Sequence, residues 1–408
     1  MPVNLSAPNK ADIVAIKGIK LASTPAGIKE NGTSDLVLIE LAQGSTVASV
    51  YTQNAFCAAP VIVAKQHQQQ TAPRYLLINA GNANAGTGQQ GLEVAQQCCR
   101  SVAKLGQVSA QSVLPFSTGV IGEQLSVEKI EAKLPVLFEL LSKDHWFEAA
   151  HAIMTTDTVA KLVSRQIEIA GKKITVTGMA KGSGMIRPDM ATMLSYIAAD
   201  ADVEQSVLNQ MLQQAVEQSF NRISVDGDTS TNDACVLIAT GKAGNEKINN
   251  FSSDNAQQLY QVIADVSQQL AHAIVRDGEG ATKFVAIEVE QGRDKAECRQ
   301  VAYAIAHSPL VKTALFASDP NWGRILAAVG RSGLTDFDLT KVDIYLDDVA
   351  LINKGEPDKE YTEKTGQAVV NQDEITIKVM LNRGQADDTV WTCDFSYDYV
   401  KINAEYRS

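Results

Sequence analysis

Hydrophobic positions recur along this chain with two alternating periods. Apolar residues spaced three and four apart predict long helices in residues 203–216 and 259–274, each with one buried face. Alternation around a glycine turn in residues 165–178 predicts a hairpin of two short strands. The apolar run MLSYIAA at 193–199 predicts a strand that is buried on both faces. Further strands are predicted in residues 283–290 and 374–381.

Helix-period and strand-period segments alternate over the whole length. This order predicts an α/β or α+β fold of layered sheets and helices, and it disfavours a helix bundle or an all-β sandwich. A chain of 408 residues is long enough for two or three domains, or for one large domain. We find no internal repeat and no linker longer than an ordinary loop, so the pattern alone sets no domain boundary.

Composition narrows the class of partner. The net charge is −11, from 47 acidic and 36 basic residues without long blocks of one sign. This balance argues against nucleic acid or an anionic membrane surface as the main partner and favours a small polar metabolite. The N-terminal segment lacks the apolar core of a signal peptide, and no run of about 18 apolar residues occurs, so we expect a cytoplasmic protein.

Cysteine and histidine usage also restricts the chemistry. The six cysteines include an adjacent pair but no C-x-x-C motif, and the five histidines show no spacing typical of metal ligands. We therefore expect a reducing compartment and no metal site.

The segment GMAKGSGMIRPDMATMLSYI at 178–197 is the first candidate for chemistry. Glycine permits a tight loop here, and the loop leads into the predicted buried strand through Ala191 and Thr192. A β-branched threonine commonly opens a strand, which is the simpler interpretation. The chemical one is that the Thr192 hydroxyl attacks the Ala191 carbonyl, and water then cleaves the resulting ester. The freed α-amine, with an ordinary pKa of about 7.7–8.0, would then serve as a base beside the hydroxyl.

Residues 181–194, KGSGMIRPDMATML, resemble the family of self-processing ornithine acetyltransferases, also known as bifunctional glutamate N-acetyltransferases, of the cyclic arginine pathway. The resemblance covers nearly the whole chain. Further blocks similar to that family follow in the expected order: NAGNANAGTG at 79–88, STGVIGE at 117–123, MTTDT at 154–158, DGDTSTND at 226–233, DGEGATK at 277–283, KTALFASDPNWGR at 312–324 and the C-terminal NAEYRS.

The resemblance implies a self-cleaving acetyltransferase with an N-terminal-nucleophile-like site. Cleavage between Ala191 and Thr192 would give an α chain, 1–191, and a β chain, 192–408, which fold together into one α/β body and assemble as an α2β2 heterotetramer. An acetyl group would pass from N-acetylornithine to glutamate through an ester on Thr192, with ping-pong kinetics. No metal or prosthetic group is implied, and the use of acetyl-CoA as a second donor stays open.

The block STGVIGE has a simple and a chemical interpretation. The simple one is a tight turn after a strand. The chemical one is an oxyanion hole, in which the Thr118 hydroxyl and the Gly119 backbone N–H stabilise the negative charge that develops during acyl transfer. The family resemblance assigns this role to Thr118 and Gly119.

Other positions resemble the amino-acid site of the family: Thr155, Lys181, Thr192, Glu279, Asn403 and Ser408. A zwitterionic ligand needs a cation for its carboxylate and an anion for its ammonium group, so a converging lysine and glutamate are the expected minimum. Taken singly, Lys181 and Glu279 would more often be solvated surface charges.

Two further motifs match known binding loops only in part. DGDTSTND resembles half of a calcium loop, but Thr231 replaces the required glycine and Leu237 the final glutamate, which favours a structural turn. NAGNANAGTG is rich in glycine but lacks the nucleotide-binding patterns G-x-G-x-x-G and G-K-[ST].

Two other functions are possible alternatives. An N-terminal-nucleophile amidase or aminopeptidase would process itself in the same way but pass the acyl group to water. A non-catalytic metabolite-binding protein would explain the glycine loops but not the A-T-M-L junction.

Overall fold

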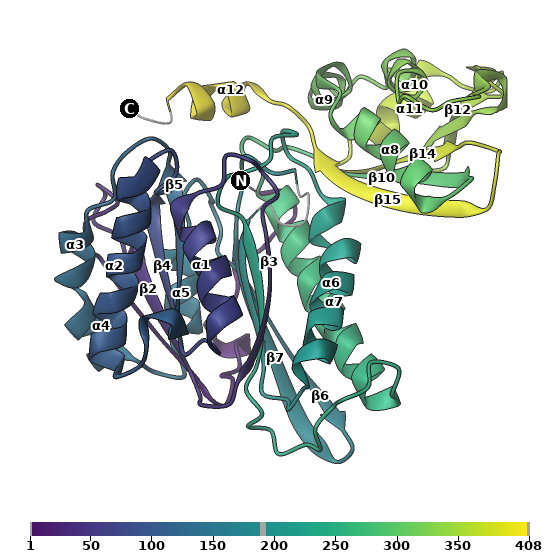
Figure 1. Cartoon of the computed structure of the whole chain (residues 1–408). Coiled ribbons are helices and arrows are strands. Elements are labelled where there is room, and N and C mark those ends of the chain that lie inside the picture. Colours follow the sequence, from purple (N-terminus) through teal and green to yellow (C-terminus); the bar gives the residue numbers. More distant parts are fainter. Residues whose placement is uncertain (1, 188–192, 406–408) are drawn as a thin grey trace.

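The computed structural model describes residues 2–187 and 193–405 of the chain. Its helices and strands form a four-layered body and a smaller lobe beside it (Figure 1). The expected α/β plan of layered sheets and helices is confirmed. Among the described residues, no helix is both long and apolar enough to cross a bilayer.

The first sheet has the strand order β1-β2-β4-β5. Its strands are β1 (Ile19–Thr24), β2 (Leu36–Leu41), β4 (Tyr75–Asn82) and β5 (Val113–Val120). The helices of its outer face and edge are α1 (Ala59–Gln70), α2 (Gly88–Gly106), α3 (Val127–Glu131) and α4 (Leu134–Leu140). Strands β4 and β5 run parallel, and their carboxyl ends approach the pocket described below. The block STGV was expected as a turn after a strand, but it lies within β5, because Thr118 and Gly119 still pair with β4.

The second sheet has the order β3-β9-β8-β7-β6. Its strands are β3 (Thr46–Tyr51), β6 (Lys161–Ile169), β7 (Lys172–Lys181), β8 (Leu194–Ala199) and β9 (Ala234–Ala239). The predicted hairpin is β6 with β7, and the predicted strand that is buried on both faces is β8. Strand β7 precedes the Ala191–Thr192 bond in sequence and β8 follows it, so one sheet takes strands from both sides of that bond.

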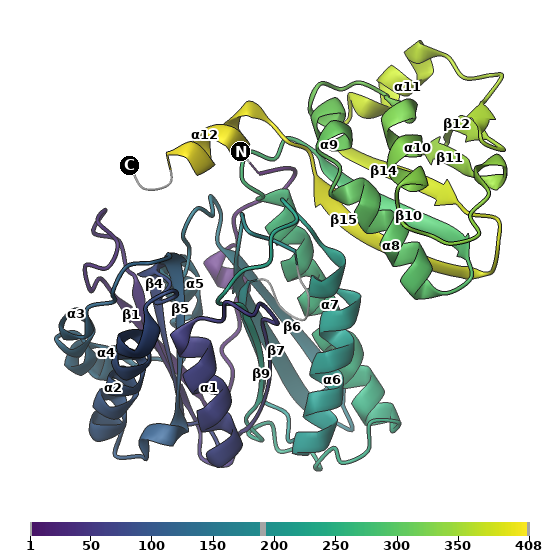
Figure 2. The same cartoon turned by 45° about the horizontal axis from the view of Figure 1, so that its top comes forward.

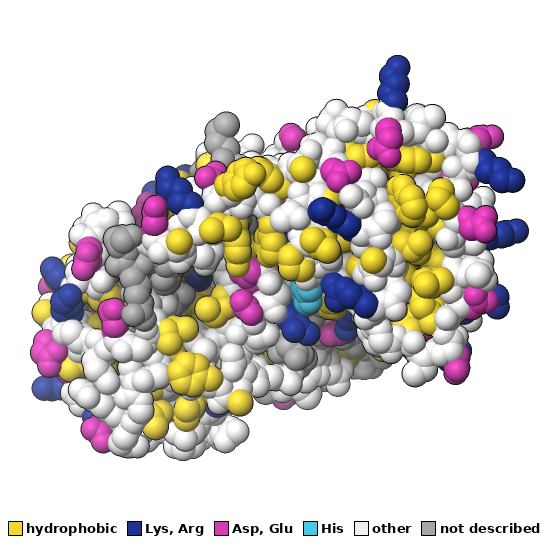
Figure 3. Space-filling view, turned by 90° about the horizontal axis from the view of Figure 1, so that it is seen from above, with side chains coloured by type: hydrophobic (Ala, Val, Ile, Leu, Met, Phe, Trp, Pro, Cys, Tyr) yellow, Lys and Arg dark blue, Asp and Glu magenta, His cyan; other side chains and the backbone are white. Residues whose placement is uncertain are grey.

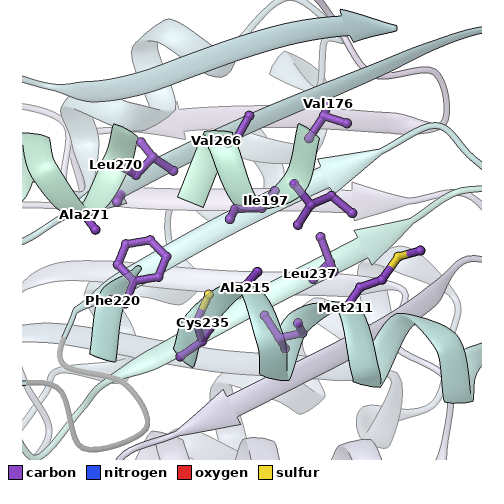
Figure 4. Packing of buried hydrophobic residues seen from close by; sticks show 14 of the residues in the cluster. Val176, Ile197, Met211, Ala215, Phe220, Cys235, Leu237, Val266, Leu270 and Ala271 are labelled. Atoms are coloured by element: carbon purple, nitrogen blue, oxygen red, sulfur yellow. The ribbon is translucent and has the colours of Figure 1, made fainter. Parts of the chain in front are cut away.

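The two sheets face each other, and helices cover them from outside (Figures 1 and 2). In β8, Leu194, Tyr196 and Ala198 point to the first sheet, while Ile197 and Ala199 point to the helices. Those helices, α6 (Gln205–Gln218) and α7 (Asp254–Arg276), confirm the two helical predictions to within a few residues. Figure 4 shows their side chains packed on the strands. Burial of each such aliphatic side chain stabilises the fold by roughly 1.5–3 kcal/mol.

Residues 284–393, which follow α7, build the smaller lobe around a hydrophobic cluster of its own. Its sheet has the order β13-β12-β11-β14-β10-β15, and it includes both strands predicted from alternation. The strands are β10 (Phe284–Gly292), β11 (Asp343–Leu346), β12 (Val349–Asn353), β13 (Glu356–Pro357), β14 (Glu374–Met380) and β15 (Ala386–Cys393). The helices are α8 (Lys295–Ala306), α9 (Pro309–Phe316), α10 (Trp322–Gly330) and α11 (Glu363–Val370).

Two helices of the main body remain to be placed, and α12 reaches the pocket described below. Helix α5 (Trp146–Ala152) lies against β1 and precedes the MTTDT block. Helix α12 (Tyr397–Ala404) follows β15 and extends back across the top of the four-layered body (Figures 1 and 2). Short 3-10 turns occur at η1 (Lys10–Asp12), η2 (Ala110–Ser112), η3 (Phe220–Arg222) and η4 (Leu339–Lys341).

Candidate active site

One cavity of about 260 Å³ collects the predicted site residues that the structure describes. It lies where the end of β5, the loop after β7, the turn before β10 and helix α12 meet. The predicted residues that line it are Thr118, Gly119, Thr155, Lys181, Glu279 and Asn403. Ala191, Thr192 and Ser408 lie outside the described residues. Met193, which follows Thr192 in sequence, lines an adjoining cavity of about 30 Å³ together with Thr118 and Lys181.

The end of β5 needs glycine at position 119. Gly119 has a φ of +131°, and a Cβ atom there would lie 2.2 Å from the carbonyl carbon of Gly81 and 2.5 Å from the nitrogen of Asn82. No side chain fits against that backbone, so β4 and β5 approach closely where the pocket begins. The Asn232 side chain donates to the Ser117 carbonyl at 2.9 Å and fixes the strand just before Thr118.

Lys181 ends β7 as a buried cation. Its Nζ donates a hydrogen bond to Oγ1 of Thr118 at 3.2 Å. Burial lowers the pKa of Lys181, and the neighbouring Lys161 lowers it further, against the opposing effect of the carboxylates of Asp157, Asp233 and Glu279. Because the Lys181 ammonium group is buried, few water molecules would have to leave it when an anionic group of a ligand binds.

A buried triad of Lys161, Asp157 and Asp277 holds the backbone next to Lys181 and Thr155. Nζ of Lys161 lies 2.6 Å from Asp157 Oδ1 and 2.7 Å from Asp277 Oδ2. Asp157 also accepts the Gly182 N–H at 2.7 Å and the Thr155 N–H at 3.0 Å. Burial opposes ionisation of Asp157, but Lys161, Lys181 and the Gly182 N–H outweigh it, so its pKa lies below the ordinary value. This triad thus joins the MTTDT block, the loop after β7 and the DGEGATK block.

Sequence reasoning did not identify this triad. Asp157 and Asp277 stand inside the family blocks at 154–158 and 277–283, but neither was singled out. Lys161 stands outside any block, at the start of β6. The aspartates could have been found as charged residues next to predicted substrate contacts, whereas nothing in the local sequence of Lys161 indicates that its side chain is buried.

Glu279 is a buried carboxylate in the turn between α7 and β10, only 6% exposed. Its backbone N–H donates to the Ser183 carbonyl at 2.8 Å, and its Oε2 accepts the Asn403 side chain at 2.8 Å. A Cβ atom at Gly184 would lie 2.4 Å from the Glu279 carboxyl carbon. Glycine at 184 therefore lets the loop after β7 lie directly against this carboxylate, within the cavity that Lys181 also lines.

The C-terminal arm, residues 393–405, carries Asn403 to the pocket. Oδ1 of Asp394 accepts the backbone N–H groups of Thr282 and Lys283 at 2.8 and 2.9 Å, just after Glu279. The buried Lys312 donates to the Thr392 hydroxyl at 3.0 Å and to the Cys393 carbonyl. These bonds fix the start of the arm. The block KTALFASDPNWGR thus contributes at least Lys312 to the architecture of the site.

The DGDTSTND block also forms part of the cavity wall. Ser230, Thr231 and Asn232 line the main cavity. Asp226 accepts the backbone N–H groups of Met185 and Ile186 at 2.5 and 2.9 Å, and Met185 has a φ of +54°. The expected structural turn is therefore also a wall of the site. In the part of the chain that is described, no group of three or more His, Cys, Asp or Glu side chains could hold a metal ion.

The cavity combines features that acyl transfer to an amino acid requires. Lys181 supplies a cation and Glu279 an anion. Thr118 supplies a hydroxyl group next to Gly119 at the end of β5. A larger hollow of about 670 Å³ lies between β3, α1 and α6, but Lys65 is the charged residue among its lining groups. The smaller cavity is the better candidate site, since it holds buried groups of both signs.

Known proteins of one family are similar to this chain over nearly its whole length. The chain matches the model described as the ArgJ family over residues 20–408. The arginine biosynthesis bifunctional protein ArgJ of Pseudomonas fluorescens is 55% identical over 393 residues, which cover 96% of this chain and 97% of that protein.

Two solved structures share shorter regions with this chain. The arginine biosynthesis bifunctional protein ArgJ of Bacillus halodurans is 38% identical, with a TM-score of 0.48, and covers 51% of this chain and 96% of its own. The ornithine acetyltransferase of Mycobacterium tuberculosis, solved in complex with ornithine, is 32% identical, with a TM-score of 0.39, and covers 46% of this chain and 99% of its own.

Proposed function

The chain belongs to the ArgJ family, and from that premise we propose that it moves an acetyl group from N2-acetyl-L-ornithine to L-glutamate in arginine biosynthesis. The observation that carries the proposal is the convergence of Thr118, Gly119, Lys181 and Glu279 on one cavity of about 260 Å³. These residues come from separate elements, and their charges and donors match an amino acid that undergoes acyl transfer.

The two buried charges would orient the amino-acid substrate. Lys181 binds its α-carboxylate, and Glu279, held by Asn403, binds the ammonium group of incoming glutamate or departing ornithine. Thr155 and Ser408 are the further substrate-binding residues that the family resemblance implies. Because both amino acids share the α-amino-acid part, one pocket serves both half-reactions.

The nucleophile would arise by self-cleavage. The Thr192 hydroxyl attacks the Ala191 carbonyl, the C–N bond breaks, and the acyl group moves to the oxygen as an ester. Water then cleaves the ester and releases an α chain, 1–191, and a β chain, 192–408. Strand β7 precedes this bond in the chain and β8 follows it, and the two strands pair with each other. This pairing supports the view that the two chains stay together in one body.

The mature chain would then transfer acetyl in two steps. The α-amine of Thr192 takes the proton of its hydroxyl, and the oxygen attacks the acetyl carbonyl of acetylornithine. The proton passes to the departing nitrogen, so that ornithine leaves and an acetyl-threonine ester remains. Glutamate reverses the sequence through its free amine. Thr118 and Gly119 stabilise the oxyanion of both tetrahedral intermediates. This chemistry would use no metal or prosthetic group. Whether acetyl-CoA also donates an acetyl group to the same threonine is a separate question, which the assay below answers.

Processing tests the nucleophile. On a denaturing gel, purified protein should migrate as two chains, and N-terminal sequencing of the second chain should begin at Thr192. Thr192→Ala should remain a single chain, because it lacks the attacking hydroxyl, whereas Thr192→Ser should still cleave. A second chain that starts at any other residue would contradict the assignment.

Acetyl transfer tests the reaction class. Cleaved protein should form acetylglutamate from acetylornithine only when glutamate is present. Release of acetate from acetylornithine without an acceptor, at a comparable rate, would identify an amidase instead. Repeating the assay with acetyl-CoA as the sole donor separates bifunctional from monofunctional activity.

We also propose an α2β2 heterotetramer in the cytoplasm. Exposed apolar side chains are present on α9 and on the C-terminal arm: Leu310 is 61% exposed, Tyr397 83% and Val400 64%. Figure 3 shows hydrophobic side chains gathered across this face of the molecule. A second copy of the cleaved protein would cover such a face. The six cysteines are unpaired, which suits a reducing compartment.

A further inference from the structure

Among the described residues, strand β3 is paired on one side only. It stands at the end of the order β3-β9-β8-β7-β6, so its other edge faces away from the sheet. This edge opens into the hollow of about 670 Å³ between α1 and α6, and Figure 1 shows β3 between those two helices. The described lining of the hollow shares no residue with the candidate active site. An open strand edge is a template for pairing with another chain.

The Val47 backbone shows which residues of β3 point to the open edge. Its N–H donates to Oε1 of Gln205 at 3.3 Å, and its carbonyl accepts Nε2 of Gln205 at 2.9 Å and Nε2 of Gln68 at 3.0 Å. In an antiparallel pair, successive residues point their N–H and carbonyl alternately toward and away from the partner strand. Since β3 pairs antiparallel with β9, the N–H and carbonyl of Ser49 point the same way as those of Val47. In the described part of the chain, no side chain or loop bonds to these two Ser49 groups.

A lysine stands at the far end of this open edge. Lys65 projects from α1, and its Nζ donates to the Thr52 carbonyl at 3.3 Å and lies 5.6 Å from the centre of the Tyr51 ring. Of the described residues that line the hollow, Lys65 alone carries a charge, and the other polar side chains are hydroxyls and amides. The hollow therefore has neutral walls and a cation at the end where β3 finishes.

We propose that this hollow binds the C-terminal end of an extended peptide, the tail of a partner protein, as an added strand that runs parallel to β3. The terminal carboxylate binds Lys65, and because Lys65 lies where β3 ends, the tail runs in the same direction as β3. In a parallel pair the bonds are slanted, so one residue bonds to two residues of its neighbour. The Ser49 N–H donates to one peptide carbonyl, and the Ser49 carbonyl accepts the N–H of the residue two positions further on.

The free length of the edge limits the occupant to a short segment. Gln68 and Gln205 already satisfy the Val47 backbone, so a long strand, such as β3 of a second copy, would have to break those bonds. From Ser49 to Thr52 the strand rises by roughly 10 Å, at about 3.3 Å per residue, which is the span of three or four peptide residues. The neutral walls favour small uncharged side chains on that segment. The end of a tail meets these limits.

Titration calorimetry of the full chain with N-acetyl-tetra-alanine tests the proposal. With its carboxylate beside Lys65, the third alanine presents its N–H to the Ser49 carbonyl, whereas the second presents its N–H away from β3. Methylation of the third nitrogen should abolish binding, and methylation of the second, the matched control, should leave Kd within a few-fold. A terminal amide in place of the carboxylate should raise Kd by about 10-fold, because a bond to a charged group is lost.

Lys65→Met tests the cation. Its Kd for the carboxylate peptide should rise by about 10-fold, while its Kd for the amide peptide should equal that of the wild type. Lys104→Met, which changes an exposed lysine on α2, is the control and should bind both peptides as the wild type does. Thermal unfolding followed by circular dichroism checks that each variant is folded. If Lys65→Met does not fold, the two peptides on the wild type still test the charge.

Three results would overturn the proposal. The first is no binding to the wild type at millimolar peptide, which is expected if a second copy fills the hollow in solution. The second is equal affinity for N-acetylalanine and the tetrapeptide, because the hollow would then recognise a small carboxylate and not a strand. The third is an equal loss of affinity on methylation of the second and the third nitrogen, because pairing with Ser49 requires only one of them.

Discussion

Replacing Glu279 by glutamine removes the negative charge of the pocket with little change of shape. Glu279 is 6% exposed, and its Oε2 accepts a hydrogen bond from the Asn403 side chain at 2.8 Å. Glutamine retains an acceptor oxygen for that bond and lies equally well against Gly184. The variant therefore tests the charge rather than the packing, and we expect self-cleavage to continue.

The size of the effect follows from burial. An exposed ion pair contributes only about 0–1 kcal/mol, because water screens it. A hydrogen bond to a charged group contributes about 1.5–3 kcal/mol, and the low exposure of Glu279 places it in this class. Since about 1.36 kcal/mol corresponds to a tenfold change, the KM for glutamate should rise between about 10-fold and about 150-fold.

The assay is the steady-state rate of acetylglutamate formation from acetylornithine at varied glutamate, on protein shown to be cleaved. Glu297→Gln is the matched control, because Glu297 is also buried, at 8% exposure, but lies on α8 in the smaller lobe. Its KM for glutamate should remain at the wild-type value. An unchanged KM in Glu279→Gln would refute the ammonium-binding role.

Two further variants test the oxyanion site and its support. Thr118→Val keeps the side-chain shape but removes the hydroxyl, so kcat should fall by about 100-fold while KM for both amino acids stays within a few-fold; a change in KM alone would indicate a substrate contact. Lys161→Met leaves Asp157 and Asp277 as buried carboxylates without their cation, which should lower the free energy of unfolding by about 3–5 kcal/mol in urea titrations. The pKa of Asp157 lies below its ordinary value, so its ionised form stabilises the fold. That contribution is present above about pH 4 and is lost as pH falls further, and Lys161→Met should reduce this acid dependence.

Most of the site could be predicted because its residues stand in contiguous blocks. Thr118 and Gly119 share one block, and Lys181 lies eleven positions before Thr192. A contiguous block can be matched to a family motif within a single sequence, without knowledge of the fold. The supporting groups were harder to find. Lys312 and Asp394, which fix the C-terminal arm, are identified only by contacts with residues far away in sequence.

The sequence alone determined the alternation of helices and strands, the buried strand β8 and the family, because periodicity and motifs are local properties. Only the tertiary structure decided that Lys181 and Glu279 line one cavity and that neither is a solvated surface charge. The chain brings them together through the pairing of β7 with β8, the packing of α7 on that sheet and the bonds of the C-terminal arm. It also decided that the DGDTSTND block is a wall of the site. Burial depends on what packs around a residue, and a local sequence pattern does not contain that information.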